Sequence, residues 1–387
     1  MILSITSVLG MLGTSSFAAL LPAFQTAWSL SNTDAGWISG MFFAGYVLGV
    51  PLLVGSTDRV DPRAIYLGSL LVGGAASFAF ALWAQGFWSA LAIRTLAGIG
   101  LAGTYMPGLK LLTDRAHGPR QGRWVAYYTA GFSLGTAFSF AYTGEVSDWL
   151  GWPIAFAGAG IGSLASFALI CFLVPPTRRL HAGRPGKLLD FRPVFRNRAA
   201  MAFVLGYTGH TYELFALRAW LTAFLIHADR VRGGSGDISK AGWLTSVTVL
   251  ISTAASIYGA EAASRSDRRK IIGRVMILSV LASAAAGFST GLPTIVVAAL
   301  CCLYSMMIMA DSAALTGGAV VSSVQEQRGA TLAVHSILGF SGGVVGPLVV
   351  GLVLDAAGGT NSYLGWGFAF LAMGMGSLLA LFAIRKL

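Results

Sequence analysis

Long apolar stretches alternate with short polar segments along the whole chain. Each stretch reaches the length of about 20 residues that a helix needs to cross the hydrocarbon core of a bilayer. The pattern predicts an all-α membrane protein with twelve transmembrane helices, at residues 2–27, 33–56, 64–84, 87–113, 124–147, 152–174, 199–227, 238–262, 271–290, 293–319, 330–354 and 361–384.

Composition narrows the class of protein. The 387 residues are 55% hydrophobic and 11% charged, and the mean hydropathy is +0.72. Soluble globular proteins carry roughly 25% charged residues, and disordered chains combine low hydrophobicity with high charge. Both classes are therefore excluded. Cys171, Cys301 and Cys302 all lie in apolar stretches, so we interpret them as packing residues and not as a disulfide or metal framework.

The positions of the basic residues predict the orientation of the chain. The net charge is +11, but the basic residues occupy short loops between apolar stretches, which argues against a nucleic-acid partner. With the amino terminus inside, 26 Lys and Arg residues divide unequally: Arg230, Arg232 and Lys240 lie outside, Arg94 and Arg218 lie within helices, and all others lie inside. Positively charged loops stay cytoplasmic. Both termini are therefore expected in the cytoplasm, in a multi-pass protein of the cell inner membrane.

One long polar segment divides the chain into two halves. It runs from Pro175 to Arg198 and contains prolines, glycines and basic residues. We expect an N-terminal six-helix bundle at 1–175, a cytoplasmic linker at 176–198 and a C-terminal six-helix bundle at 199–387.

The two halves repeat each other. Residues 151–162 read Gly-Trp-x-x-Ala-Phe-x-x-x-Gly-x-Gly, and the same pattern recurs at residues 365–376. Likewise, the pattern Gly-x-x-x-Asp occurs at 144–148 and again at 351–355. Six helices per half give both halves the same orientation. Parallel repeats with a binding site between them are a transporter architecture.

Polar residues at helix ends predict caps. Ser31 with Asp34 three residues later forms the pattern of a capping box at the start of the second helix. Asp237 holds the corresponding position in the second half. Glu145 and Asp148, at the outer end of the fifth helix, are expected to be solvated.

Three motifs resemble those of the major facilitator superfamily. Residues 55–63, Gly-Ser-Thr-Asp-Arg-Val-Asp-Pro-Arg, look like its loop between helices 2 and 3, with an Asp-Pro pair in place of a later glycine and a basic residue. Residues 94–103 match its Arg-x-x-x-Gly-x-Gly-x-x-Gly pattern in helix 4. Residues 131–135, Gly-x-x-x-Gly, are similar to the glycine motif that its antiporters carry in helix 5. The resemblance implies a secondary transporter that works by alternating access.

The resemblance also implies a gate at the cytoplasmic ends of the helices. Asp58 stands at the position of the superfamily's gating carboxylate, and Arg59 and Arg63 are expected to pair with acids on facing helices. In the second half, Glu261 and Arg265 are the matching candidates. The alternative is that these basic residues only set the orientation in the membrane.

Candidate substrate-binding residues lie in helices that line the central cavity in this superfamily. Arg94 and Arg218 are charged residues within predicted helices 4 and 7, at matching depth. A charge at such depth is expected to face a cavity or a partner. Tyr207 and Thr211 fall on the same helical face as Arg218. For Arg94 the resemblance implies bonding to helix 1 or a role in proton transfer, and the alternative is snorkelling to the interface.

Proton coupling requires a group that can change its protonation inside the membrane. Asp311, in predicted helix 10, is the best candidate, because a carboxyl group in low dielectric favours its protonated form. Glu213 and His210 are rivals. The alternative role for Asp311 is a structural pair with a group such as His335.

These observations predict transport of a small organic or inorganic anion, coupled to protons or to counter-exchange. The alternative is a proton-driven efflux antiporter for drugs or metabolites. No Walker loop, zinc-ligand spacing or nucleophile–base set is visible in the sequence, so we expect neither an enzyme nor a bound cofactor or metal. The expected partners are the substrate, protons and lipid, and the expected state is a monomer.

Overall fold

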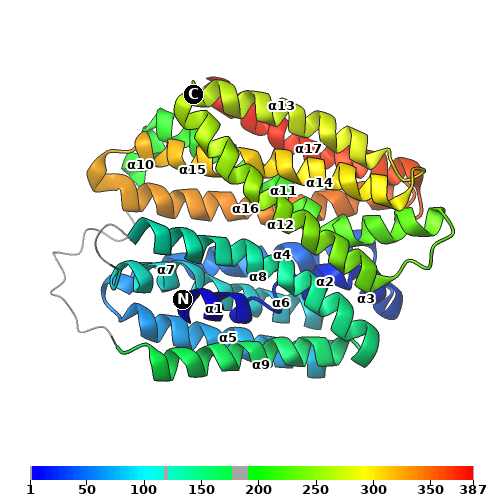
Figure 1. Ribbon diagram of the computed structural model, residues 1–387, viewed down its shortest axis with the longest axis horizontal. Helices are drawn as coiled ribbons and strands as arrows, with labels where there is room; N and C mark the ends of the chain where they lie inside the picture. Colours follow the sequence, from blue (N-terminus) through cyan, green and yellow to red (C-terminus); the bar gives the residue numbers. More distant parts are fainter. Residues whose placement is uncertain (1, 117–120, 177–190, 387) are drawn as a thin grey trace.

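The computed structural model describes residues 2–116, 121–176 and 191–386 and is built from helices. Figure 1 shows helices α1–α9 in the lower half of the molecule and α10–α17 in the upper half, with most helices aligned along the long axis. We call the end where α9 finishes and α10 begins the linker end, and the opposite end the far end. The domain boundaries at 175 and 199 stay a prediction.

In the lower half, the described residues form nine α-helices and a short 3-10 helix. The helices are α1 (Ile2–Gly10), α2 (Ser16–Ala19), α3 (Leu21–Trp28), α4 (Asn32–Leu53), η1 (Gly55–Asp58), α5 (Pro62–Trp83), α6 (Phe87–Ala102), α7 (Tyr105–Thr113), α8 (Gln121–Leu150) and α9 (Trp152–Leu173).

The upper half contains eight α-helices and a second 3-10 helix. They are α10 (Arg192–Arg196), α11 (Arg198–Val231), α12 (Ile238–Arg265), α13 (Arg268–Gly287), α14 (Thr294–Ala310), α15 (Ser312–Val321), η2 (Gln325–Gln327), α16 (Arg328–Ala356) and α17 (Tyr363–Lys386). The described end of the expected linker therefore includes a short helix, and most of the rest of that linker lies outside the described residues.

Nine helical segments among the described residues have the length and apolar composition of membrane spans. The stretches expected to form helices 1, 5 and 7 are not among them. The first of these is interrupted, and α8 and α11 contain charged residues. Twelve spans with both termini on one side of the membrane stay a prediction.

Three predicted helices are broken in the structure, and the sequence analysis was wrong to draw them as continuous. The first is divided at Met11–Ser15 and at Leu20, next to glycines and before Pro22. The fourth is interrupted at Gly103 and Thr104. The tenth is interrupted at Asp311, which ends α14 and begins α15. Each break exposes backbone groups that need other partners.

The predicted caps are confirmed. The Ser31 hydroxyl accepts from the Asp34 amide at 3.0 Å, and the Asp34 carboxylate accepts from the Ser31 amide at 3.1 Å, which completes the capping box of α4. Asp237 accepts from the Lys240 amide at 2.8 Å at the start of α12.

Carboxylates join the two halves at the far end. Asp355, at the end of α16, accepts from the backbone amides of Asn32 and Thr33 at 3.1 and 2.8 Å and from their side chains at 2.7 and 2.6 Å. These amides are the first of α4, so the carboxylate also meets the positive end of that helix. The far ends of α4 and α16 are thereby held together.

Glu145 makes a second contact between the halves, through side chains only. Its Oε2 accepts from the hydroxyl of Ser239 at 2.6 Å and from the indole of Trp243 at 3.1 Å. Glu145 is half-buried and Asp148 is exposed, which agrees with the expectation of solvated side chains, but the carboxylate of Glu145 also contacts the other half. It lies at the far end of α8, against the start of α12, as Asp355 of α16 lies against α4. At the far end, carboxylates thus join α16 to α4 and α8 to α12.

Candidate functional site

A small central cavity lies between the two halves. Its volume is about 50 Å³, and helices α4, α6, α8 and α11 surround it together with the broken first helix. The side chains that line it are two cations, several hydroxyl groups and four phenylalanines: Arg94, Arg218, Thr14, Ser15, Ser39, Thr136, Phe43, Phe132, Phe140 and Phe215, beside Ala18, Leu101 and Ala219. The lining therefore combines positive charge with aromatic surface and includes no acidic residue.

Arg94 is held by the broken first helix. Its guanidinium donates to the carbonyl oxygens of Gly13 and Thr14 at 3.3 and 3.1 Å, and it lies 4.2 Å from the centre of the Phe42 ring. The break between α1 and α2 supplies these carbonyl groups. Of the alternatives for this residue, the geometry agrees with bonding to the first helix. Its Nε has no partner among the described residues.

Arg218 reaches the same cavity from α11 but has fewer contacts. The side chain is buried, with 8% of its surface exposed, and its nearest aromatic contact is the Phe215 ring at 6.0 Å. Within the described residues, no hydrogen bond or ion pair holds its guanidinium. The Ser39 hydroxyl, also on the cavity wall, is buried and without a partner in the same part of the chain. A buried hydroxyl without a partner is uncommon in proteins, and that of Ser39 lies on the wall of the cavity beside the two arginines.

Tyr207 and Thr211 do not line this cavity. Tyr207 stacks on His335 with ring centres 4.0 Å apart and on His210 at 5.2 Å. Thr211 is buried, and its hydroxyl donates to the carbonyl oxygen of Gly339 in α16. Both contact helices of the upper half, and only Arg218 of this predicted face reaches the central cavity.

Asp311 is paired with His210. Their Oδ1 and Nδ1 atoms lie 2.7 Å apart, and 3% and 1% of these side chains are exposed. His335, the alternative partner, instead lies 3.1 Å from the Thr316 hydroxyl through Nε2. The break between α14 and α15 places the carboxylate where α11 passes, so two of the coupling candidates are buried side by side, although their two nearest atoms are not aligned for a hydrogen bond.

Glu213 is separate from this pair. It is fully buried, and its carboxylate accepts from the hydroxyls of Ser279 at 3.0 Å and Tyr304 at 2.8 Å and from Ser377. Every one of these donors belongs to the upper half. The third coupling candidate therefore lies inside the C-terminal bundle, away from the cavity lining.

The linker-end candidates show two kinds of contact. Arg63 donates to the carbonyl oxygens of Val174 and Cys171 at 2.6 and 2.8 Å, so it caps the end of α9, and among the described residues it has no acidic partner of the kind expected. Arg265 pairs with Glu261 at 2.6 Å, one turn away on the same exposed helix surface. The side chain of Asp58 lies outside the described residues.

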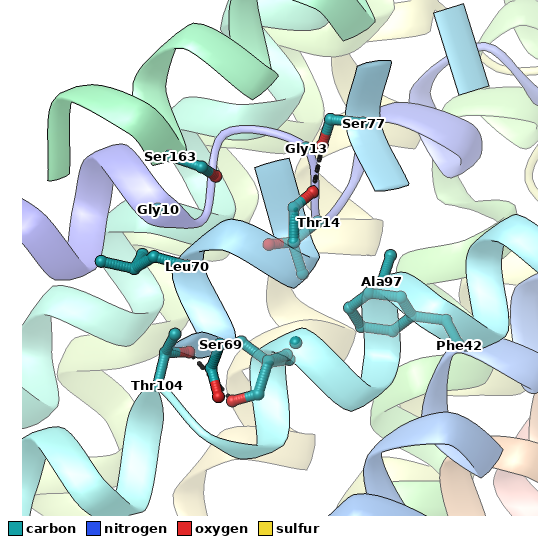
Figure 2. Close-up of a pocket in the computed structure, with 13 residues that line it drawn as sticks. Gly10, Gly13, Thr14, Phe42, Ser69, Leu70, Ser77, Ala97, Thr104 and Ser163 are labelled. Carbon is teal, nitrogen blue, oxygen red and sulfur yellow. Dashed lines mark hydrogen bonds between the residues drawn. The ribbon is translucent and has the colours of Figure 1, made fainter. Parts of the chain in front are cut away.

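A further hollow lies inside the lower half, beside the break in the first helix. It has a volume of about 30 Å³, and small side chains line it, among them Gly10, Gly13, Thr14 and Ser77 (Figure 2). The hollow leaves space next to the carbonyl groups that hold Arg94. This hollow and the hydroxyls of Ser39 and Thr136 on the wall of the central cavity were not predicted from the sequence. Isolated serines and threonines in apolar helices form no distinctive sequence pattern.

Comparison with known proteins gives a family match. A family model described as Major Facilitator Superfamily matches residues 3–229. The 3-(3-hydroxy-phenyl)propionate transporter of Escherichia coli (strain K12) is 30% identical over 206 residues, which cover 52% of this chain and 50% of the relative. The chloramphenicol resistance protein of Streptomyces lividans is 26% identical over 265 residues, or 67% and 64% of the two chains. The niacin transporter NiaP of Acinetobacter baylyi is 26% identical over 159 residues, or 41% and 36%. The chain thus spans less than two thirds of the length of these relatives.

Solved structures share the fold. A bacterial homolog of the human lysosomal transporter Spinster, in an inward-facing and unoccupied conformation, superposes with a TM-score of 0.79 at 15% identity over 99% of this chain and 94% of the other. The nucleoside transporter NupG gives a TM-score of 0.76 at 15% identity over 99% and 97%.

Proposed function

We propose that this chain, which belongs to the major facilitator superfamily, is a multi-pass secondary transporter and that its substrate is a small organic anion. The observation that carries this proposal is Arg218, a buried cation on the wall of the central cavity without a hydrogen-bond partner among the described residues. A planar guanidinium binds carboxylate and phosphate groups through two parallel hydrogen bonds. An anion in the cavity would supply the charge and the acceptors that Arg218 lacks.

The rest of the lining supports an organic body on that anion. Four phenylalanine rings face the cavity, and hydroxyls such as Ser39 stand between them. Binding sites of this kind combine apolar surface with a few polar groups that fix orientation. Two relatives agree with this chemistry, since they are named for niacin and for 3-(3-hydroxy-phenyl)propionate, which are aromatic carboxylates.

The substrate would bind in a more open conformation. A cavity of about 50 Å³ holds only a few water molecules. The far end is closed by Asp355 and Glu145, so we propose that access from the linker end alternates with access from the far end as these contacts break and form. Arg59, Arg63, Glu261 and Arg265, together with Asp58, would act at the linker end.

Coupling to protons is part of the proposal. We propose that the buried pair of Asp311 and His210 takes up and releases one proton during transport, which changes the net charge of the pair by one, and Glu213 is a second carboxylate for this role. We further propose twelve spans in two bundles joined by the 176–198 linker, with both termini in the cytoplasm, in a monomer of the inner membrane. The excess of basic residues on one side supports this orientation.

Efflux of neutral drugs is the second candidate function. One relative is named a chloramphenicol resistance protein, and aromatic side chains line the cavity. A thermal-stability assay on the purified protein separates the two candidates, because a ligand that binds the folded state raises its apparent stability. We expect niacin and 3-(3-hydroxyphenyl)propionate to stabilise the protein, and nicotinamide and chloramphenicol to have little effect. Stabilisation by the two neutral compounds alone would contradict anion transport.

A further inference from the structure

A second hollow lies at the far end, outside the closed contacts. It has a volume of about 250 Å³ and is bounded by α3, α11 and the loop before α17. It adjoins a wider opening of about 710 Å³, with which it shares Pro22, Gln25, Ile226, Arg230, Thr360 and Asn361. We call the two hollows together the vestibule.

The polar groups of the vestibule suit an anion. Arg230 lines both hollows, and no ion pair holds it within the described residues. His227 lines the inner hollow; 8% of its surface is exposed, and its Nε2 has no partner in that same part of the chain. The carboxamides of Gln25 and Asn361 lie on the opposite wall. Of the described residues that line the two hollows, none is acidic.

Three carboxylates lie near the vestibule, and no ion pair joins any of them to Arg230 within the described residues: Asp34 accepts from Ser31, Asp355 accepts from Asn32, and Asp229 has other partners. Asp229 precedes Arg230 in sequence, but its carboxylate accepts from the Lys240 ammonium at 2.9 Å, from the Gly236 amide at 3.1 Å and from the Thr294 hydroxyl at 3.1 Å. Asp229 and Lys240 therefore satisfy each other on another side of α11. Arg230 is left as the cation of the vestibule.

One face of α11 connects the vestibule to the central cavity. Ala219 lines the central cavity, whereas Ala223, Ile226 and Arg230 line the vestibule. These positions are spaced by four, three and four residues, so they share one helical face. Arg230 lies twelve residues beyond Arg218, which is about 18 Å along the helix at 1.5 Å per residue. The far-end contacts of Asp355 and Glu145 close the path between the two halves at this level.

We infer that the vestibule is a second anion site, in which Arg230 and His227 hold the carboxylate of a small organic acid just outside the closed gate. The inference rests on the proposed function and extends it, because it places a docking position for the same class of substrate on the α11 face that reaches the central cavity at Ala219. Arg230 supplies two parallel N–H donors, and the imidazole of His227 can carry its proton on the unpartnered Nε2.

The test measures binding of 4-fluorobenzoate by fluorine NMR to the full chain in nanodiscs of phosphatidylcholine, which offers no anionic lipid. Binding is measured in an Arg218→Gln background, so that the proposed central site is impaired. We expect residual binding that benzoate displaces and benzamide does not. Adding Arg230→Gln should weaken this binding at least about tenfold, the effect of a lost charge-assisted hydrogen bond. Adding His227→Phe, which keeps a ring beside Trp366, should weaken it about threefold.

Arg232→Gln is the matched control, because Arg232 is an exposed cation on the same turn and lines neither hollow. It should change the affinity less than twofold, and all variants should keep the melting temperature of their background. The inference is overturned if the Arg218→Gln protein shows no benzoate-competed binding, or if Arg230→Gln and Arg232→Gln have equal effects. A different result would separate the two proposals. If Arg218→Gln alone leaves the total affinity of the protein unchanged while Arg230→Gln abolishes binding, the vestibule site is supported and the proposed anion site at Arg218 is contradicted.

Discussion

Arg94 and Arg218 carry the same charge into one cavity but differ in what holds them. Two backbone carbonyl groups of the broken first helix bind Arg94, whereas among the described residues Arg218 makes only a distant contact with Phe215. A cation with internal partners stabilises the fold, and a cation without them is free to bind a ligand. The two arginines should therefore respond differently to the same substitution.

Arg218→Lys tests the substrate role directly. Lysine keeps the charge but replaces a planar fork by a point charge. If Arg218 holds a carboxylate through two hydrogen bonds, the lysine variant should lose about 10- to 100-fold in affinity for the best stabilising acid, or ~1.5–3 kcal/mol. Arg218→Ala should lose more. Arg94→Lys is the comparison, and it should lower the melting temperature more than the affinity. Near wild-type affinity in both Arg218 variants would rule out the anion site.

Asp311→Asn tests proton coupling at the His210 pair. The amide keeps the shape of the carboxyl group but cannot gain or lose the proton. Substrate-induced proton movement in proteoliposomes should disappear, while counterflow of labelled substrate, which needs no net proton transfer, should remain at a measurable rate. Glu213→Gln is the matched control, since its carboxylate binds three hydroxyls in the upper half. Proton movement that persists in Asp311→Asn and is lost in Glu213→Gln would assign the coupling to Glu213.

At the scale of elements, the contact of α16 with α4 holds the two halves together at the far end. Gly351 of α16 packs on the first turn of α4, where an added Cβ would overlap the carbonyl oxygen of Asn32. Close approach at this glycine lets the Asp355 carboxylate reach the first amides of α4. The contact between the two helices therefore depends on the small residue at Gly351 and on the carboxylate of Asp355.

Two substitutions should therefore open the far end. Gly351→Ala should prevent the close approach, and Asp355→Asn should weaken four hydrogen bonds to one carboxylate. We expect each to raise the alkylation rate of a cysteine placed at Ala18, on the central cavity, by about tenfold, which corresponds to ~1.4 kcal/mol. Gly317→Ala is the control, because a Cβ there meets nothing within 4 Å. Equal rates in all three variants would show that these contacts do not hold the gate.

The sequence predicted helices better than it predicted their interruptions. Apolar stretches and the Ser31–Asp34 box marked where helices begin, because both are local signals. The break at Asp311 was missed, since a single polar residue in an apolar stretch also fits a continuous helix. The partners of Arg94, Asp311 and Asp355 lie on helices that are distant in sequence. A single sequence does not show which distant helices are in contact, so these partners could not be predicted. Arg94 and Arg218 could still be identified as candidate cavity residues. A charged side chain inside an apolar stretch is costly in the membrane unless it faces a cavity or a partner.

At the scale of the whole molecule, the two halves form similar units that face each other. The carboxylate of Asp355 on α16 meets α4, and that of Glu145 on α8 meets α12, so each half contributes one acid and one helix start to the far-end closure. The repeated Gly-x-x-x-Asp pattern predicts these contacts only in part. Its Asp355 makes the contact in the second half, but in the first half the contact is made by Glu145 and not by Asp148. Closure by both halves suits a rocking motion around a central site.

The orientation of this assembly in the membrane is the last prediction. Basic residues gather at the linker end, so that end should face the cytoplasm. Single cysteines at Ser235, in the exposed far-end loop after α11, and at Gly329, exposed at the linker-end start of α16, report the two sides in a background with the three native cysteines replaced. In intact spheroplasts an impermeant maleimide should label Ser235→Cys and should label Gly329→Cys only after lysis. Arg230 would then stand on the outer side, where a substrate arriving from outside meets the vestibule first. The reverse labelling would contradict the predicted orientation and place the vestibule on the cytoplasmic side. Its anion site would then release substrate into the cytoplasm or bind substrate from it.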